Sequence, residues 1–219
     1  MRWPDTDKLQ AMMPLPDGYR WQRLQRQEIP EAIAAIRSWF PAVGVGVASC
    51  FLRETYYETQ VSFDETDAAS EDGKNVLAII IRHGDELVGF GSWEREPDAL
   101  SLYGKIGMIA PAHRNARLAV RAMELGEAIG RHIGAGFIYN LATLKTPHMQ
   151  LALERAGYQL VGVTPGYDRE IVGEGVIKRV YEALYAKVLV PDEELLVPDP
   201  ENLSPRVREL FALLFPRSR

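Results

Sequence analysis

The hydrophobic pattern of the first part of the chain changes from a period of two to the period of a helix. Apolar and polar residues alternate over residues 19–25, which is the pattern of a half-buried strand. Apolar residues at helical spacing then follow Ile29 and Pro30 and stop at Pro41, so we expect a helix between them. Residues 47–63 are compatible with a second helix, although the β-branched and aromatic residues of their second half favour extended structure.

Three strands are predicted next. Residues 76–81 form a continuous apolar run, and a turn at Gly84 and Asp85 connects them to residues 87–94 in the pattern of a hairpin. Residues 102–109 form a third, mostly apolar run, in which Gly104 and Gly107 indicate a bulge or a close approach of two backbones. The acidic residues 66–75 before the hairpin predict a loop or a helix end.

Residues 109–119 join this third strand to a long amphipathic helix. The apolar residues of that helix share one face: Leu118, Ala122, Leu125, Ile129 and Ile133. The backbone N–H groups of its first turn are unpaired, and Arg114 and Arg117 stand beside them without an acidic partner. Since the helix dipole disfavours cations at this end, we expect a bound anion here, and phosphate is the usual biological one.

The rest of the chain predicts further alternation of strands and helices. We expect a strand over residues 137–144, a helix from Thr146 to Gly157, a strand over 158–163, a polar loop over 164–170 and a strand over 176–190. A proline-rich, acidic segment then precedes a short helix over 205–215, which needs a surface to dock on. The expected organisation is an irregular arm over residues 1–18, one domain over 19–190 and a C-terminal arm with a docking helix over 191–219.

Composition excludes several classes of protein. Of the 219 residues, 47% are hydrophobic and 25% are charged, as in ordinary globular domains, and the net charge of −5 argues against general nucleic-acid binding. We find no signal-peptide pattern and no apolar run of roughly 18 residues, so we expect a cytoplasmic protein without a membrane partner. The single cysteine, Cys50, is read as a small buried residue and not as a nucleophile, and the scattered histidines predict no metal site.

The element order resembles that of the GNAT superfamily of acyl-CoA N-acyltransferases over roughly residues 19–190. The family's pyrophosphate loop has the pattern Val-x-Pro-x-x-Arg/Gln-x-x-Gly-x-Gly/Ala. Five residues match it in register: Ile109, Pro111, Arg114, Leu118 and Ala119. Arg117 occupies the central glycine position, so it must either adopt the dihedral angles of that glycine or contact phosphate with its side chain.

A second motif supports the resemblance. The sequence Glu-Arg-Ala-Gly-Tyr over residues 154–158 is similar to the family's Glu-Lys-x-Gly-Phe at the end of the second coenzyme-contacting helix. The family often has a tyrosine four residues before that glycine as general acid, and Leu153 stands there in this chain.

The resemblance implies an α/β (α+β) fold, with a mixed, mostly antiparallel sheet of about seven strands, helices on both faces and a splayed pair of strands at 102–109 and 137–144. It implies acetyl-CoA or another acyl-CoA as co-substrate, with the pyrophosphate at the helix start and the thioester between the splayed strands. The residues implied in coenzyme binding are Met108, Ile109, Arg114, Asn115, Ala116, Arg117, Leu118, Ala119, Thr143 and His148.

The catalytic residues have competing interpretations. Glu94 ends its strand where the family commonly has a base, but a solvated glutamate fits equally well. Tyr181 and Tyr185 face one side of a strand, so either could replace the missing acid or pack in the core. His148 could act as a base or contact the coenzyme, and the charged residues 168–170 could shape an acceptor pocket or pair with one another.

These observations favour an acyl-CoA-dependent N-acyltransferase that transfers an acyl group, most simply acetyl, to the amine of a small molecule or peptide. Transfer is expected to be direct, within a ternary complex, because Cys50 lies outside the loop and the splayed strands. The first alternative is a non-catalytic domain that binds coenzyme A or a protein, and the second is a domain without any coenzyme. The last helix could pack on a second subunit, which would give a homodimer.

Overall fold

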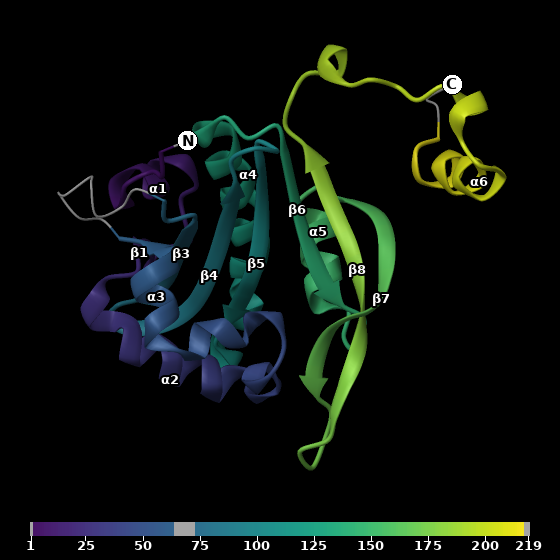
Figure 1. Ribbon diagram of the computed structural model, residues 1–219. Helices are drawn as coiled ribbons and strands as arrows, with labels where there is room; N and C mark the ends of the chain where they lie inside the picture. The colour runs from purple at the N-terminus through teal and green to yellow at the C-terminus, as the bar shows by residue number, and fades with distance from the viewer. Residues whose placement is uncertain (1, 64–72, 217–219) are drawn as a thin grey trace. The chain divides into compact units, whose positions relative to one another are not determined.

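The computed structural model describes residues 2–63 and 73–216, and the chain divides into two compact units, Met1–Leu189 and Val190–Arg219 (Figure 1). The helices are α1 (Thr6–Met12), α2 (Ile29–Trp39), α3 (Glu54–Gln60), α4 (Leu118–Ile133), α5 (His148–Arg155) and α6 (Pro205–Leu214). The strands are β1 (Tyr19–Arg23), β2 (Val61–Ser62), β3 (Val76–His83), β4 (Glu86–Glu96), β5 (Ser101–Ile109), β6 (Phe137–Thr143), β7 (Gln159–Ile171) and β8 (Ile177–Val188). Short 3-10 helices are η1 (Arg26–Glu28), η2 (Pro41–Gly44), η3 (Val47–Leu52), η4 (Pro111–Ala116), η5 (Asp192–Glu194) and η6 (Pro200–Asn202).

The first unit is built on one mixed sheet with the strand order β1-β3-β4-β5-β6-β8-β7, and β2 pairs with β3 beside this path. Neighbouring strands are antiparallel except for two parallel pairs, β2 with β3 and β5 with β6. This confirms the mixed, mostly antiparallel sheet that the resemblance implied, with seven strands in the main order and an eighth at its side.

The core has one layer on each face of the sheet, as β3 shows most clearly. Side chains of a strand alternate between its faces, and a strand covered on both faces is apolar throughout. Leu77 and Ile79 of β3 pack in the cluster that contains α4, whereas Ala78 and Ile80 pack in the cluster that contains α2. Residues 76–81 are therefore apolar throughout because helices cover both faces of the sheet at β3.

Two local predictions are wrong. Helix α1 occupies part of the segment expected to be irregular, because the Asp5 carboxylate accepts a hydrogen bond from Lys8 N at 2.8 Å and Leu9 is buried. The predicted polar loop at 164–170 belongs to β7. A shift in register between Thr164 and Asp168 accommodates the intervening proline and glycine without ending the strand.

Other segments follow the prediction more closely. Residues 47–63 are helical first, in η3 and α3, and extended at the end, in β2. Gly134 ends α4 in the left-handed conformation, with φ of 77°. Of the predicted acidic loop at 66–75, residues 66–72 lie outside the described part of the chain.

The second unit contains η5, η6 and α6. Helix α6 begins after Ser204, whose hydroxyl accepts a hydrogen bond from Val207 N at 3.4 Å, with Pro205 in the first position. Its apolar side chains are largely exposed within the described chain, and Leu213 exposes 77% of its surface. Docking of this helix, on its own chain or on a second subunit, stays a prediction. None of the helices within residues 2–63 and 73–216 has both the length and the apolar surface to cross a bilayer.

Candidate active site

The parallel strands β5 and β6 pair along only part of their length. Their register runs from Ser101 opposite Phe137 to Gly104 opposite Asn140 and stops there. On the other side of β5, Ser92 of β4 pairs with Ile106 and Trp93 pairs with Gly104, so Lys105 is an extra residue. Such a bulge bends its strand and increases the local twist. The splayed pair and the bulge expected near the glycines are both present.

A cavity of about 880 Å³ lies where β5 and β6 separate, a size typical of small-ligand sites. Seven residues predicted to bind the coenzyme line it: Met108, Ile109, Arg114, Arg117, Ala119, Thr143 and His148. Leu118 does not belong to the lining, because it is fully buried in the core below the start of α4. The side chains of Asn115 and Ala116 lie outside the part of η4 that the structure describes.

The backbone of Arg117 takes the conformation that glycine would take at this position. Arg117 lies between η4 and α4 with φ of 56° and ψ of 17°, in the left-handed region. This conformation costs a residue with a Cβ atom roughly 1–2 kcal/mol. Arg117 therefore combines a backbone conformation that favours glycine with a charged side chain, and the residue lines the cavity.

The start of α4 is suited to an anion. The side chain of Arg114 also lines the cavity, and its Nε donates to the carbonyl of Ile109 at 3.3 Å. The first-turn amides of α4 point out of the helix without intrahelical acceptors. Two guanidinium groups and these amides form a positive end of the cavity, where a diphosphate would be stabilised. Apolar side chains, among them Met123 and Met149, continue the wall from there.

Glu94 forms an ion pair with Lys105, the extra residue of the β5 bulge. Among the described residues, Glu94 does not line the cavity. Its carboxylate accepts a hydrogen bond from Lys105 Nζ at 2.9 Å, and the same ammonium lies 3.3 Å from the Tyr56 hydroxyl. Burial acts to lower the pKa of Lys105, but the hydrogen bond to Glu94 and the neighbouring Tyr56 outweigh it and raise that pKa. Lys105 therefore remains charged, and it lines the described cavity whereas Glu94 does not.

Tyr181 and Tyr185 lie on the face of β8 that does not contribute to the described cavity wall. Tyr181 is 58% exposed. Tyr185 is buried and donates a hydrogen bond to Glu154 on α5 at 2.7 Å, and burial together with this bond raises its pKa to about 12. Side chains alternate between the two faces of a strand. Glu182, which follows Tyr181, therefore points to the opposite face, and it lines the cavity.

Three acidic residues of β7 and β8 form a negative part of the cavity wall: Asp168, Glu170 and Glu182. The sequence indicated Asp168 and Glu170 as one of two alternatives, and their alternation with exposed Arg169 on a strand brings them to one face. Glu182 was missed, because a lone glutamate within an apolar strand carries no motif. Register places it opposite Thr143 on β6 and Thr164 on β7.

Cys50 is buried in the cluster that contains α2, and its thiol donates to the carbonyl of Val47 at 3.3 Å. Burial raises the pKa of this thiol, although Lys105 and Tyr56 act in the opposite direction. A protonated, buried thiol is a poor nucleophile. It also does not line the cavity in the described chain.

The chain has the fold of the GNAT superfamily of acyl-CoA N-acyltransferases, and solved structures of acetyltransferases align with it over about four fifths of its length. No protein-family model matches the sequence, and no curated protein sequence matches it.

Three of the similar structures illustrate the likeness. An acetyltransferase from Salmonella typhimurium that modifies the N-terminal serine of a ribosomal protein is 9% identical, with a TM-score of 0.59 over 81% of this chain and 99% of that chain. A spermidine N-acetyltransferase from Vibrio cholerae is 12% identical, with a TM-score of 0.57 over 80% and 95%. A microcin self-immunity acetyltransferase in complex with acetyl-CoA and AMP is 12% identical, with a TM-score of 0.59 over 81% and 98%.

Proposed function

We propose that this protein is an N-acyltransferase that transfers an acyl group, most simply acetyl, from acyl-CoA to an amine. The observation that carries the proposal is the cavity at the splay of β5 and β6, which has a positive wall at the start of α4 and an acidic wall on β7 and β8. An acyl-CoA has an anionic nucleotide end and an uncharged thioester end, and an amine acceptor is a cation in water. The two kinds of charge on the wall suit these two substrates.

The residues of the cavity fit a coenzyme in three respects. Arg114, Arg117 and the first-turn amides of α4 would bind the diphosphate. Beyond Gly104 and Asn140, the facing edges of β5 and β6 no longer pair with each other, so their backbone groups are available to the amides of the pantetheine arm. The methionines of the wall would cover its apolar parts.

Chemistry in such a site needs no covalent enzyme intermediate. The amine must lose a proton, the tetrahedral intermediate must be stabilised, and the leaving thiolate must gain a proton. The buried, protonated Cys50 offers no route for a transfer in two stages. Attack of the amine on the thioester within a ternary complex is therefore the mechanism we propose.

The test is release of coenzyme A thiol from acetyl-CoA in the presence and absence of a panel of primary amines. Release that depends on the amine, with formation of the N-acetylated product, is the expected result. Saturable binding of acetyl-CoA without release would instead support the non-catalytic alternative, which the replacement of the family tyrosine by buried Leu153 keeps open. If acetyl-CoA produces no thermal shift at all, the proposal fails.

A further inference from the structure

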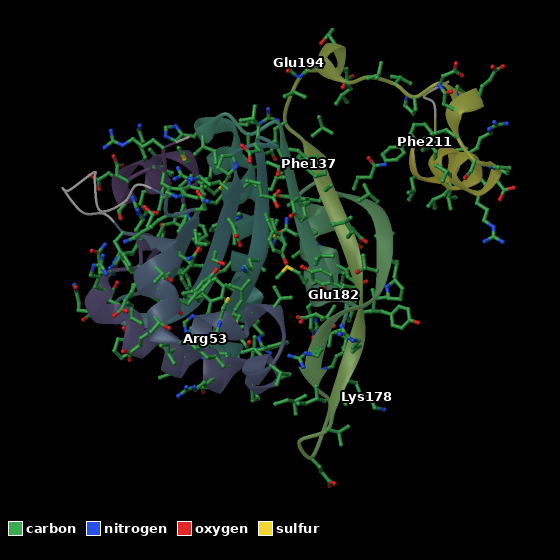
Figure 2. All side chains as sticks on the ribbon, in the orientation of Figure 1. Arg53, Phe137, Lys178, Glu182, Glu194 and Phe211 are labelled. Atoms are coloured by element: carbon green, nitrogen blue, oxygen red, sulfur yellow. The ribbon has the colours of Figure 1, made fainter. Side chains whose placement is uncertain are left out.

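Glu182 is a buried carboxyl group on the cavity wall with an unsatisfied oxygen. Only 7% of the residue is exposed, and among the described residues its Oε2 has no hydrogen-bond partner. Figure 2 labels Glu182 midway along β8, the strand next to β6. A buried polar atom without a partner costs free energy, so it persists where a ligand or a reaction step uses it.

The two neighbouring acids already have partners. Asp168 Oδ1 accepts hydrogen bonds from Val47 N at 2.8 Å and from Arg169 N at 2.7 Å. Glu170 forms an ion pair with Lys145 at 2.5 Å. Of the three acids on this wall, Glu182 is the one with a buried carboxylate oxygen, Oε2, that has no hydrogen-bond partner among the described residues.

The surroundings of Glu182 favour proton uptake near neutral pH. Burial is the main cause that raises its pKa to about 7, and the negative charges of Asp168 and Glu170 on β7 add to it. The charge of Glu182 in turn helps to raise the pKa of Tyr103 on β5, and Lys145 forms its ion pair with Glu170. A group with this pKa can accept a proton and release it again at neutral pH.

The part of the wall next to these acids is apolar. The hydrogen bond from Val47 N to Asp168 fixes η3 against β7, and a Cβ atom at Gly44 of η2 would contact Ile171 at 3.4 Å. This segment and the end of α2 contribute Trp39, Phe40, Val43, Val45 and Ala48 to the cavity. A ligand that reaches Glu182 here would meet aromatic and aliphatic surface around the unpartnered oxygen of its carboxyl group.

We propose that the Glu182 carboxylate binds the ammonium group of the acceptor and accepts its proton, and that the acceptor is a primary monoamine with an apolar body. This inference rests on the proposed function. The ammonium transfers one proton to Glu182, and the free amine then attacks the thioester carbon, so that a C–N bond forms and the C–S bond breaks. The second proton of the attacking nitrogen ends on the coenzyme A sulfur, and Glu182 returns its proton to solvent.

A polyamine suits this wall poorly. Each additional ammonium group would need its own carboxylate, and those of Asp168 and Glu170 are engaged. An unpaired charge against aromatic and aliphatic side chains is strongly unfavourable. The acceptor is therefore expected to differ from the spermidine named for one of the similar structures.

The experiment compares phenethylamine with spermidine as acceptors, using thiol release by the full chain across pH. Phenethylamine should have the higher kcat/KM by about tenfold or more, and its kcat/KM should rise with pH through about 7. Glu182→Gln should lower kcat for phenethylamine by about 100-fold or more and abolish the rise with pH, with acetyl-CoA affinity unchanged. The matched control is Glu174→Gln in the exposed turn between β7 and β8, which removes the same charge and should keep wild-type kinetics and pH profile.

The outcomes separate the two proposals. If the wild-type protein acetylates amines but Glu182→Gln keeps the activity and its pH dependence, or if spermidine is preferred, this inference is wrong and the proposed function stands. If no amine causes thiol release from the wild-type protein, both are wrong. Acetyl-CoA titrations of both variants by calorimetry serve as the control. Wild-type affinity in a variant without turnover means that the variant is folded, binds the coenzyme and has lost only the transfer step.

Discussion

Gly104 of β5 and Asn140 of β6 are the last paired residues before the two strands separate, and no space for a side chain remains between them. A Cβ atom added at Gly104 would overlap with Asn140 Oδ1. The contact between Gly104 and the Asn140 side-chain amide therefore marks the point where the pairing of β5 with β6 ends and the cavity begins.

Gly104→Ala should therefore disturb the cavity at its narrow end. The methyl group forces the Asn140 side chain or the strand to move, and we expect acetyl-CoA affinity to fall by about tenfold with a loss of stability of about 1–3 kcal/mol. Calorimetric titration and thermal unfolding measure the two effects. Gly162→Ala is the control, because a Cβ atom there meets nothing within 4 Å. Equal behaviour of the two variants would contradict the role given to this contact.

Arg114→Glu should weaken acetyl-CoA binding by about tenfold to 100-fold, because it replaces a cation at the start of α4 by an anion that repels the diphosphate. The weakening should diminish as salt concentration increases. Lys8→Glu on α1 introduces the same change of charge at an exposed residue outside the described cavity wall and should leave affinity unchanged. An unaltered affinity in Arg114→Glu would remove the diphosphate site from this loop.

Arg117 separates the contribution of the backbone from that of the side chain. Both Arg117→Gly and Arg117→Ala remove the guanidinium group, but glycine alone relieves the left-handed conformation. The free energy of unfolding of the glycine variant should exceed that of the alanine variant by about 1 kcal/mol, so the glycine variant should unfold at a higher temperature. If both variants bind acetyl-CoA equally and more weakly than the wild type, the side chain contributes to binding. If Arg117→Gly binds as tightly as the wild type, the backbone suffices.

Cys50→Ala should retain the activity of the wild-type protein. The thiol is buried among apolar side chains, so its removal is expected to cost about 1 kcal/mol of stability and to leave kcat within about twofold. Thiol release under saturating acetyl-CoA gives the comparison. A folded Cys50→Ala protein without turnover would refute direct attack and require an acyl-cysteine.

Glu182 should make stability depend on pH. Its pKa is about 7 in the folded protein and has an ordinary value of 4.5 in a model compound, so the folded state retains the proton longer. Stability contributed by this group is therefore lost as pH rises from about 5 to about 7. Glu182→Gln cannot lose a proton, so its gain in unfolding temperature over the wild type should be larger at about pH 8 than at about pH 5. An identical difference at both pH values would contradict the raised pKa.

Much of the fold follows from local patterns. The apolar run at 76–81, the glycines of β5 and the helical spacing after Arg117 predicted the centre of the sheet, the bulge and α4. Helix α1 did not follow, because its stability depends on Leu9 packing in a core that the local sequence does not specify. Strand β7 passes through Pro165 and Gly166, which normally indicate a turn.

The sequence predicted the loop at the start of α4 more directly than the acidic wall of the candidate site. Arg114 and Arg117 belong to a contiguous motif, whereas the acidic wall combines β7 and β8 with η3, segments far apart in the chain. The assignment of Glu94 as base depended on its place at a strand end, and the sequence could not show that the bulge would direct Lys105 toward it. Burial and missing hydrogen bonds, which single out Glu182, exist only in the folded protein.

Acyl transfer from acyl-CoA to an amine yields two products that can be measured in one reaction. Purified protein is incubated with acetyl-CoA and phenethylamine, and the free thiol and the N-acetylated amine are quantified together by mass spectrometry. We expect equal amounts of both products, formed only when protein and amine are present. Binding of acetyl-CoA without either product, for phenethylamine and for every other amine tested, would show that the protein is not an N-acyltransferase.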